Sequence, residues 1–294
     1  MYLQRKRGSV MRGEGGLRSV AHVAAGALSV LACEASPQQR ARLIDALRGR
    51  GHVQFADSFE QLGHLLRTTT ESVDVVVLPT RDVTGSDAIR TIREIAVARP
   101  RVAIVGYCRA GSQYSTDIRA LSAAGVHQFV FIGIDDAGVA FRAVLDAARR
   151  QCAAECVMEA LCSIVPAALH PVVEAALAKP ETVTTVSELA DALGVHRKTL
   201  FNRCERADFL PPAELLTWVR LALVAYMLET TGCTVETIAN ELGFPSDTAL
   251  RNSMKRYTGQ RASEIRTSGG VSRVLRALCE RVRGEVTARD LHLV

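Results

Sequence analysis

The chain of 294 residues contains no apolar run that reaches the roughly 20 residues needed to cross a membrane. None of its eight cysteines belongs to a Cys-x-x-Cys pair, and most lie within apolar stretches. These absences argue against a membrane protein and against a disulfide scaffold, so we expect reduced cysteines in a cytoplasmic protein. With 48% hydrophobic and 23% charged residues, the composition also excludes a chain that is disordered throughout.

The N-terminal residues include several arginines and precede an apolar stretch, Val20 to Cys33. This arrangement loosely imitates a secretory signal. In the other interpretation, Ala27 to Ala32 is the first buried strand of a folded domain. We favour the strand because an alternation of strands and helices continues from it, and we predict a disordered basic tail over residues 1–26.

Five short apolar runs alternate with five amphipathic segments between residues 27 and 150. The expected strands are 28–32, 52–56, 73–78, 101–107 and 127–132, and the expected helices are 38–49, 59–67, 86–98, 112–124 and 136–150. Five such units in order predict a parallel sheet with helices on both faces. Functional groups of such a sheet are expected at the carboxyl ends of its strands.

This half resembles the receiver domain of response regulators, in strand order and in phrases such as Val73–Leu78 and Ala120–Val126. The resemblance implies a flavodoxin-like α/β domain, but the phosphotransfer residues do not match. Pro79 stands where the phosphate-accepting aspartate is expected, and proline has no nucleophilic oxygen. The acidic pair after the first strand is reduced to Cys33-Glu34, and Ile132-Gly133 replaces the usual lysine and proline after the fifth.

Asp82 lies near Pro79 in the sequence and is an alternative acceptor, although a solvated loop carboxylate is the simpler interpretation. We therefore predict a receiver-like domain over residues 27–150 that is not phosphorylated. Three roles stay open for it: dimerisation, binding of a partner protein, and sensing of a small ligand.

Residues 151–180 are predicted to form a helical linker. Cys152 and Cys156 share one helix face, and Cys162 and His170 follow further along. A metal or redox sensor is one interpretation of these residues. A buried stripe of small residues is the other, and we favour it because no flanking pattern completes a metal motif.

An internal repeat lies in the C-terminal half. Residues 188–195 match 237–244, and the following segments 196–206 and 245–256 match as well. Identical residues are 49 positions apart before the turn and 50 apart after it, so one extra turn residue explains the change. A tandem repeat of this kind is a stronger indication than either segment alone.

The repeated residue types suit two helix-turn-helix units. Ala190 and Ala239 are small enough for the second helix of each unit to cross closely over the first. Gly194 and Gly243 tolerate the left-handed conformation that ends a helix. The core positions of the second helices are expected to be Leu200, Leu250 and Met254.

Capping residues mark where these helices begin. Thr185 with Glu188 predicts a capping box for the leading helix of the first unit, and Ser246 predicts an N-cap for the recognition helix of the second.

Residues 212–229 predict a long helix that joins the two units. Pro212-x-x-Leu215-Leu216, Arg220-Leu221 and Ala225-Tyr226-Met227-Leu228 resemble the connecting helix of the AraC/XylS family, and 235–239, 242–244, 255–259 and 263–266 resemble its second unit. The resemblance implies an all-α DNA-binding domain over residues 181–268. It also implies two recognition helices in successive major-groove segments of one DNA face, about 34 Å apart. His196 departs from the serine that the family often has, so we expect the first unit to be less rigid or to bind more weakly.

Positive charge is concentrated on the two recognition helices. Residues 181–268 contain ten Lys/Arg and eleven Asp/Glu, yet 196–206 and 246–261 each carry four basic residues against one acid. This placement fits neutralisation of DNA phosphates.

Side chains early in each recognition helix are expected to meet base edges, because arginine pairs with guanine and asparagine with adenine. The predicted residues are Arg197, Lys198, Phe201 and Asn202 in the first unit, and Thr248, Arg251 and Asn252 in the second. The DNA-binding set is completed by Arg203, Arg206, Lys255 and Arg256, of which Arg203, Lys255 and Arg256 are expected to bind phosphates. For Phe201, packing on a thymine methyl and a partly buried core contact both stay open.

We therefore predict a sequence-specific transcription regulator that binds double-stranded DNA and has no catalytic residue, metal or cofactor. A second copy of the chain and RNA polymerase are its further candidate partners. The alternatives are a phosphotransfer enzyme, opposed by the missing aspartate, and a DNA-repair methyltransferase, opposed by the lack of a Pro-Cys-His-Arg signature. Residues 269–294 are predicted to form a C-terminal extension with an amphipathic helix over 271–283.

Overall fold

The computed structural model describes residues 27–69, 72–111, 114–267 and 269–290. The tail predicted over residues 1–26 lies outside the described residues. Within them, no helix combines the length and the apolar character required to cross a membrane.

A parallel sheet organises the N-terminal half. Its strands are β1 (Leu28–Cys33), β2 (Gly51–Ala56), β3 (Val75–Leu78), β4 (Ala103–Cys108) and β5 (Gln128–Phe131). They lie in the order β2-β1-β3-β4-β5, and every neighbouring pair is parallel. This is the strand order of flavodoxin-like, doubly wound domains, so the predicted receiver-like α/β fold is confirmed.

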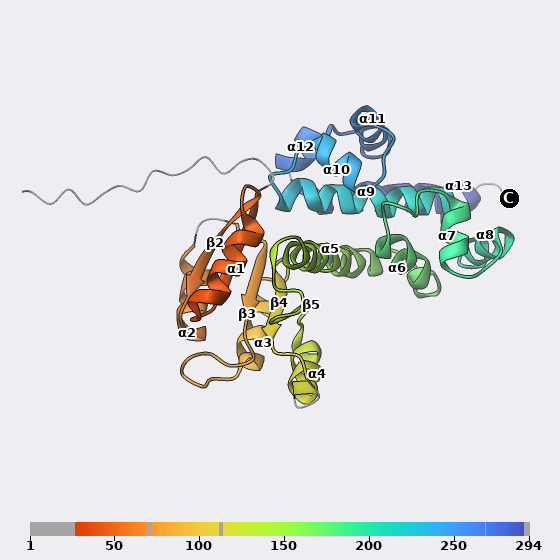
Figure 1. Ribbon diagram of the computed structural model, residues 1–294. Coiled ribbons are helices and arrows are strands. Elements are labelled where there is room, and N and C mark those ends of the chain that lie inside the picture. The colour runs from red at the N-terminus through yellow and green to blue at the C-terminus, as the bar shows by residue number, and fades with distance from the viewer. Residues whose placement is uncertain (1–26, 70–71, 112–113, 268, 291–294) are drawn as a thin grey trace, which may run out of the picture.

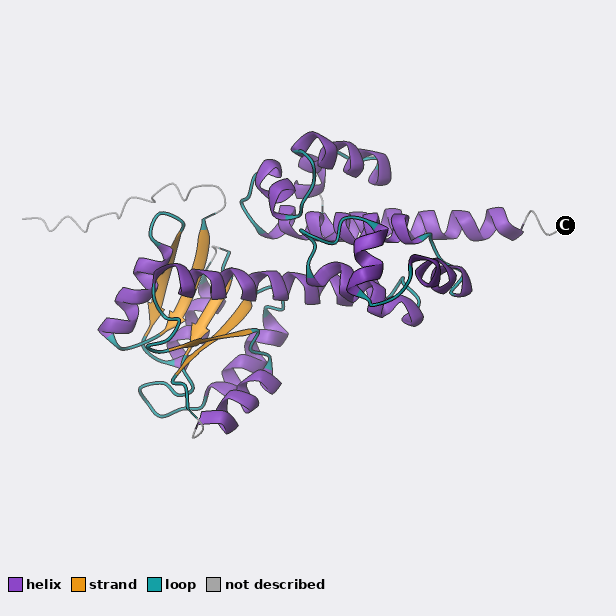
Figure 2. Cartoon of the chain, turned by 45° about the vertical axis from the view of Figure 1, so that its right-hand side comes forward, coloured by secondary structure: helices purple, strands orange, loops and turns teal. Residues whose placement is uncertain are grey.

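Helices cover both faces of this sheet (Figures 1 and 2). One face carries α1 (Pro37–Leu47) and α5 (Gly138–Cys162), and the other carries α2 (Phe59–Thr68), α3 (Ala88–Ala98) and α4 (Ser115–Ala124). Because β3 is buried on both faces of the sheet, all of its residues are apolar.

Helix α5 is longer than the sequence analysis predicts. One helix of 25 residues replaces the separate helices expected on either side of residue 150. No glycine or proline lies between Val139 and Cys162, so nothing in the sequence interrupts the backbone hydrogen bonds. The first half of α5 packs on β4 and β5, and its second half packs on α6 (His170–Ala178) and α9 (Pro212–Thr230). Residues 151–180, predicted to be a linker, therefore belong to the core of the C-terminal domain.

The C-terminal half is entirely helical. Besides α6 and α9 it contains a 3-10 turn η2 (Ala167–Leu169), α7 (Val186–Ala192), α8 (Arg197–Arg206), α10 (Val235–Glu241), α11 (Asp247–Thr258), α12 (Ala262–Thr267) and α13 (Gly270–Asp290). Helix α9 is its centre, because every residue from Trp218 to Leu228 is buried. The predicted C-terminal helix is present as α13, which packs along α9 (Figure 1). An ion pair of 2.7 Å between Arg281 and Glu214 joins these two helices.

Candidate nucleic-acid interface

The two copies of the sequence repeat form two helix pairs, α7–α8 and α10–α11. The turn after α7 contains Gly194 with φ +62°, and the turn after α10 contains Gly243 with φ +66°. Both angles lie in the left-handed region, so glycine is needed there for the chain to leave the first helix. Ala190 and Ala239 are buried under the second helix of their unit, as predicted.

The second turn is one residue longer than the first. Two residues separate Leu193, the C-cap of α7, from the N-cap His196, whereas three separate Leu242, the C-cap of α10, from the N-cap Ser246. The extra residue is Pro245, which accounts for the change of offset from 49 to 50.

Side-chain caps begin all four helices of the two units. Thr185 and Glu188 form the predicted capping box of α7, and Thr234 accepts from the backbone N–H of Thr237 in α10. In α11, Ser246 Oγ accepts from the N–H of Ala249 at 3.1 Å.

His196 also caps its helix. Its Nδ1 accepts from the N–H of Lys198 at 3.2 Å. The imidazole thus takes the capping role of the serine expected from the resemblance, and α8 has a side-chain cap.

The eleven predicted DNA-binding residues all lie on the surface of α8 or α11. Asn202 and Arg203 are half-buried and the other nine are exposed. The opposite side of each helix is fully buried, with Leu200 and Cys204 in α8 and Leu250 and Met254 in α11. The predicted core positions are confirmed, and α8 and α11 each present a mainly polar, basic face to solvent.

Phe201 stands out on this surface because 44% of it is exposed. This exposure leaves both interpretations of Phe201, a contact with a thymine methyl and a partly buried core contact, as predictions. At the matching position of the other unit, Arg251 forms an ion pair of 3.2 Å with Asp247 one turn earlier. The carboxylate holds the guanidinium over the outer face of α11.

Arg220 fixes the second unit on the connecting helix, a role that sequence reasoning missed. It is 7% exposed, donates to the carbonyl of Leu242 at 2.7 Å, and stacks 4.5 Å from the ring centroid of Phe244. The guanidinium thereby satisfies a free carbonyl where α10 ends. Burial lowers the pKa of this group. The signal in the sequence is a lone charge inside an apolar helix.

A close backbone approach ties the two units together. A Cβ at Gly243 would lie 2.5 Å from the carbonyl oxygen of Glu181, which precedes the first unit. Glycine at this turn is therefore required twice, for its φ angle and for the space that a side chain would fill.

The carboxyl edge of the sheet is where a receiver domain would carry its phosphate. Pro79, Cys33, Glu34 and Asp82 line a cavity of about 390 Å³ at this edge. Asp82 accepts hydrogen bonds from the N–H groups of Phe59, Thr84 and Ser86 and from the Thr84 hydroxyl. Desolvation opposes its ionisation, but these bonds outweigh that effect and hold its pKa below the ordinary value. The carboxylate stabilises the loop after β3.

A buried polar cluster closes the same edge. Asp136 accepts from Arg42, from the hydroxyl of Tyr107 at 2.9 Å and from the N–H of Gly133 at 2.9 Å. Desolvation would raise the pKa of Asp136, but its hydrogen bonds, led by that of Arg42, keep it lowered. The cluster ties α1 and β4 to the loop after β5, and no local pattern in the sequence indicates it.

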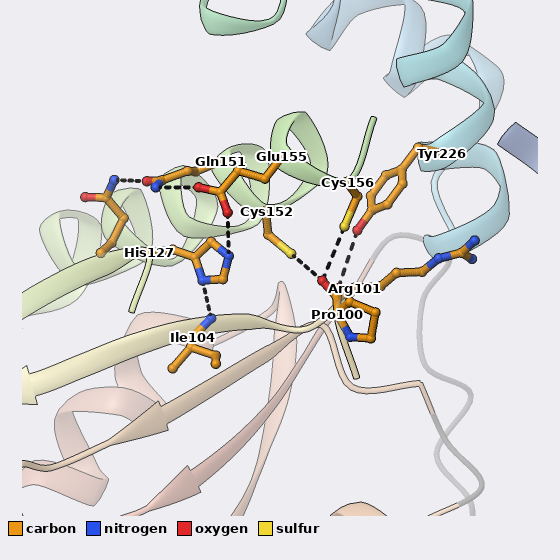
Figure 3. Close-up of polar contacts among 10 residues, drawn as sticks. Pro100, Arg101, Ile104, His127, Gln151, Cys152, Glu155, Cys156 and Tyr226 are labelled. Atoms are coloured by element: carbon orange, nitrogen blue, oxygen red, sulfur yellow. Dashed lines mark hydrogen bonds and ion pairs between the residues drawn. The ribbon is translucent and has the colours of Figure 1, made fainter. Parts of the chain in front are cut away.

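The cysteines of α5 lie at the junction of the two halves (Figure 3). Cys152 and Cys156 both donate to the carbonyl of Pro100, at 3.5 and 3.2 Å. Cys162 lies elsewhere, 3.7 Å from His170 Nδ1. The described residues contain no group of three or more His, Cys, Asp or Glu placed to hold a metal. Cys152 and Cys156 thus tie α5 to the loop before β4.

Ion pairs cross from the receiver-like domain to the helical domain. Arg101 pairs with Glu229 at 2.7 Å, and Arg149 pairs with Glu241 at 3.7 Å. Glu229 also accepts from the N–H of Val271 at 3.3 Å. The end of α9 therefore holds both the receiver-like domain and the beginning of α13.

Comparisons with known proteins agree with this geometry. Residues 189–268 match a family model described as a helix-turn-helix domain. Two relatives, AraC-like transcription regulators of Streptomyces lividans and Streptomyces antibioticus, are each 35% identical over 100 residues, which is 33% of this chain and 33% of theirs. The chain thus matches about a third of the length of these curated relatives.

Two solved structures resemble the chain distantly. A receiver domain from Clostridium thermocellum is 17% identical, with 42% of this chain and 95% of that chain covered and a TM-score of 0.35. The xylose-binding transcription activator XylR is 13% identical, with 83% and 71% covered and a TM-score of 0.33. Because these scores are low, the fold assignment rests on strand order and connections. The capped helix pairs and the family match agree that residues 189–268 form a helix-turn-helix domain.

Proposed function

We propose that this protein is a sequence-specific DNA-binding regulator of transcription, with α8 and α11 as its two recognition helices. The observation that supports this best is the pairing of two capped helices, each buried on one side and basic on the other, around a single buried connecting helix. A lone basic helix is compatible with many functions. Two of them on one rigid frame fit successive segments of a major groove.

In this proposal, the residues early in each helix contact the base edges. Arg251 and Asn252 of α11 and Asn202 of α8 carry the side chains that pair bidentately with guanine and adenine. Phe201, exposed in the free protein, is suited to contact a thymine methyl. The list of base-reading residues is completed by Arg197, Lys198 and Thr248.

The basic residues further along each helix bind DNA phosphates in this proposal. Arg203 and Arg206 of α8 and Lys255 and Arg256 of α11 are solvent-accessible and neutralise DNA charge in this proposal. They set the position of the helices and carry no sequence information themselves.

The receiver-like domain acts without phosphorylation in this proposal. Pro79 supplies no nucleophile, and the carboxylate of Asp82 already accepts four hydrogen bonds from its own loop and from α2. Control of DNA binding is therefore expected from ligand or partner binding rather than from an aspartyl phosphate.

Selection of random DNA fragments on the purified full-length protein tests the proposal. We expect an enriched motif made of two half-sites whose centres are separated by about one helical turn of DNA. Arg197→Ala/Lys198→Ala should relax one half-site only, and Arg251→Ala/Asn252→Ala should relax the other.

The matched control is Arg67→Ala/Arg93→Ala, which removes two exposed arginines from α2 and α3, away from both units. It should leave the motif unchanged. Enrichment of no motif, or of the same motif by all variants, would contradict the proposal.

A further inference from the structure

A cavity of about 1070 Å³ separates the receiver-like domain from the helical domain. It lies at the amino-terminal edge of the sheet, where Arg50 precedes β2, Asp74 precedes β3 and Arg101 precedes β4. This is the edge opposite to the one where a receiver domain carries its phosphate. The volume is slightly above the range of about 300–1,000 Å³ that is typical of small-molecule sites.

The two walls of this cavity carry opposite charge. The wall formed by the receiver-like domain and α5 has six arginines and two aspartates, and the wall formed by residues from Leu177 onward has three glutamates and no lysine or arginine. The six arginines are Arg50, Arg99, Arg101, Arg142, Arg149 and Arg150. Their number on one wall is the feature that calls for a ligand.

Part of this charge is already neutralised. Arg101 and Arg149 pair with Glu229 and Glu241 of the other wall. Of the two aspartates on the arginine wall, Asp74 accepts from the N–H of Ser29, and burial raises its pKa. Once Arg101 and Arg149 are paired across the cavity, four arginines and two aspartates remain on this wall.

Among the six arginines, Arg50 and Arg150 are the best placed to bind a ligand. Both are exposed, and within the described part of the chain neither side chain forms a hydrogen bond or ion pair. Arg99 and Arg142, by contrast, donate to the backbone carbonyls of Leu66 and Ala46. An acidic group in the cavity would face two guanidiniums that nothing in the described chain occupies.

Part of the remaining lining is apolar. Ala153 and Ala154 of α5 and Leu223 and Met227 of α9 belong to this part. Helix α5 belongs to the arginine wall, contains no glycine or proline after Gly138, and packs directly on α9 of the other wall, which fixes the separation of the two walls. The cavity is therefore preformed, which lowers the cost of binding.

We propose that this cavity binds a small organic anion, whose acidic group is held by Arg50 and Arg150 and whose apolar body lies between α5 and α9. Because Thr237 and Glu241 of α10 also line the cavity, the ligand contacts the second helix-turn-helix unit directly. Any effect on DNA affinity rests on the proposed function, whereas the binding itself does not.

Two fluorescent probes of the same skeleton test the site: the anion 8-anilinonaphthalene-1-sulfonate and its uncharged analogue N-phenyl-1-naphthylamine. Titrated into the full-length protein, the anion should bind about tenfold more tightly than the neutral probe, because it gains charged hydrogen bonds to arginine. In Arg50→Gln/Arg150→Gln this preference should fall to nearly one.

Arg67→Gln/Arg93→Gln is the matched control, because it removes the same charge from exposed positions on α2 and α3. It should keep the full preference for the anion. Equal binding of the two probes by the unmodified protein, or loss of the preference in both double variants, overturns the proposal. Far-ultraviolet circular dichroism of each variant checks that the fold is intact.

A final measurement separates this proposal from the proposed function. DNA affinity is measured with and without saturating anionic probe, for the unmodified protein and for Arg50→Gln/Arg150→Gln. A probe-dependent change confined to the unmodified protein supports coupling between the cavity and the second unit. Failure of all forms to bind DNA contradicts the proposed function and leaves the probe result standing.

Discussion

Phe201 of the first helix-turn-helix unit and Arg251 of the second occupy matching positions 50 residues apart, on helices that otherwise follow one plan. Around Arg251, the second unit is braced by Arg220 from α9 and contacts α12 and α13. The first unit is braced by α9 and the η2 turn, and its recognition helix is capped by histidine. One backbone repeat thus presents an exposed aromatic ring at one position and an ion-paired guanidinium at the matching position, which under the proposed function predicts one apolar and one polar contact with DNA.

The largest expected effect comes from removing the anchor of the second unit. Arg220→Ala leaves the carbonyl of Leu242 without its buried partner and the ring of Phe244 without its stacked guanidinium. We expect a loss of about 3 kcal/mol in the free energy of unfolding, measured by urea denaturation. Arg261→Ala, at an exposed position near α11, is the control and should change little. Similar losses for both variants would show that Arg220 has no special role.

The next largest effect distinguishes the polar DNA contact proposed for Arg251 from the apolar contact proposed for Phe201. Arg251→Ala should weaken DNA binding by about 2 kcal/mol, roughly thirtyfold, and relax the base preference at one position. Phe201→Ala should cost less and leave the salt dependence of binding unchanged, because no charge is removed. Phe201→Arg should steepen that salt dependence. Binding isotherms at several salt concentrations measure all three, and equal slopes for Phe201→Arg and the unmodified protein would contradict the comparison.

A smaller effect concerns the two caps. His196→Ser should stabilise α8, since serine is a preferred N-cap, while Ser246→Ala should destabilise α11 by about 1 kcal/mol. Thermal unfolding of the two variants checks both directions. If Ser246→Ala leaves the unfolding temperature unchanged, the cap of α11 does not contribute as the structure indicates.

The smallest effect is a difference in pH response between the leading helices. Hydrogen bonds from the N–H and hydroxyl of Thr184 and the N–H of Thr185 hold the pKa of Glu188 below its ordinary value of 4.5. A group whose folded pKa is lowered contributes stability above its unfolded pKa and loses it as the pH falls through the folded pKa. Helix α7 should therefore fray at pH values below about 4.5, whereas α10, capped by the hydroxyl of Thr234, should not.

Amide hydrogen exchange at the N-termini of α7 and α10, corrected for intrinsic rates, measures this difference. Glu188→Gln removes the titrating group and should abolish the pH response of α7. An equal response of both helices to acid would show that the capping box is not its source.

Much of the fold follows from local patterns in the sequence. The five apolar runs mark the five strands, most clearly β1, β3 and β4, which are buried along their whole length, and less clearly the partly buried edge strands β2 and β5. The helix-turn-helix units follow from Gly194 and Gly243, since few other residues adopt the left-handed angles found there. Such signals lie within a few residues of each other, so they can be read without knowing the tertiary structure.

Long-range partners could not be predicted in the same way. Arg101 and Glu229 are 128 residues apart, and nothing in either neighbourhood indicates that they pair. The continuity of α5 across residue 150 was missed because its apolar face changes partner there, from the sheet to α9, without any change in helix propensity.

The sequence by itself determined three features: the parallel α/β fold class of the first half, the tandem repeat, and the basic faces of α8 and α11. Each of them depends on residue types at fixed local spacing. Only the tertiary structure decided that α5 joins both halves, that Arg220 anchors the second unit, and that arginines from three separate segments line one wall of a cavity. The physical reason is that charge and burial at these sites come from chain segments that meet only when both domains are packed together.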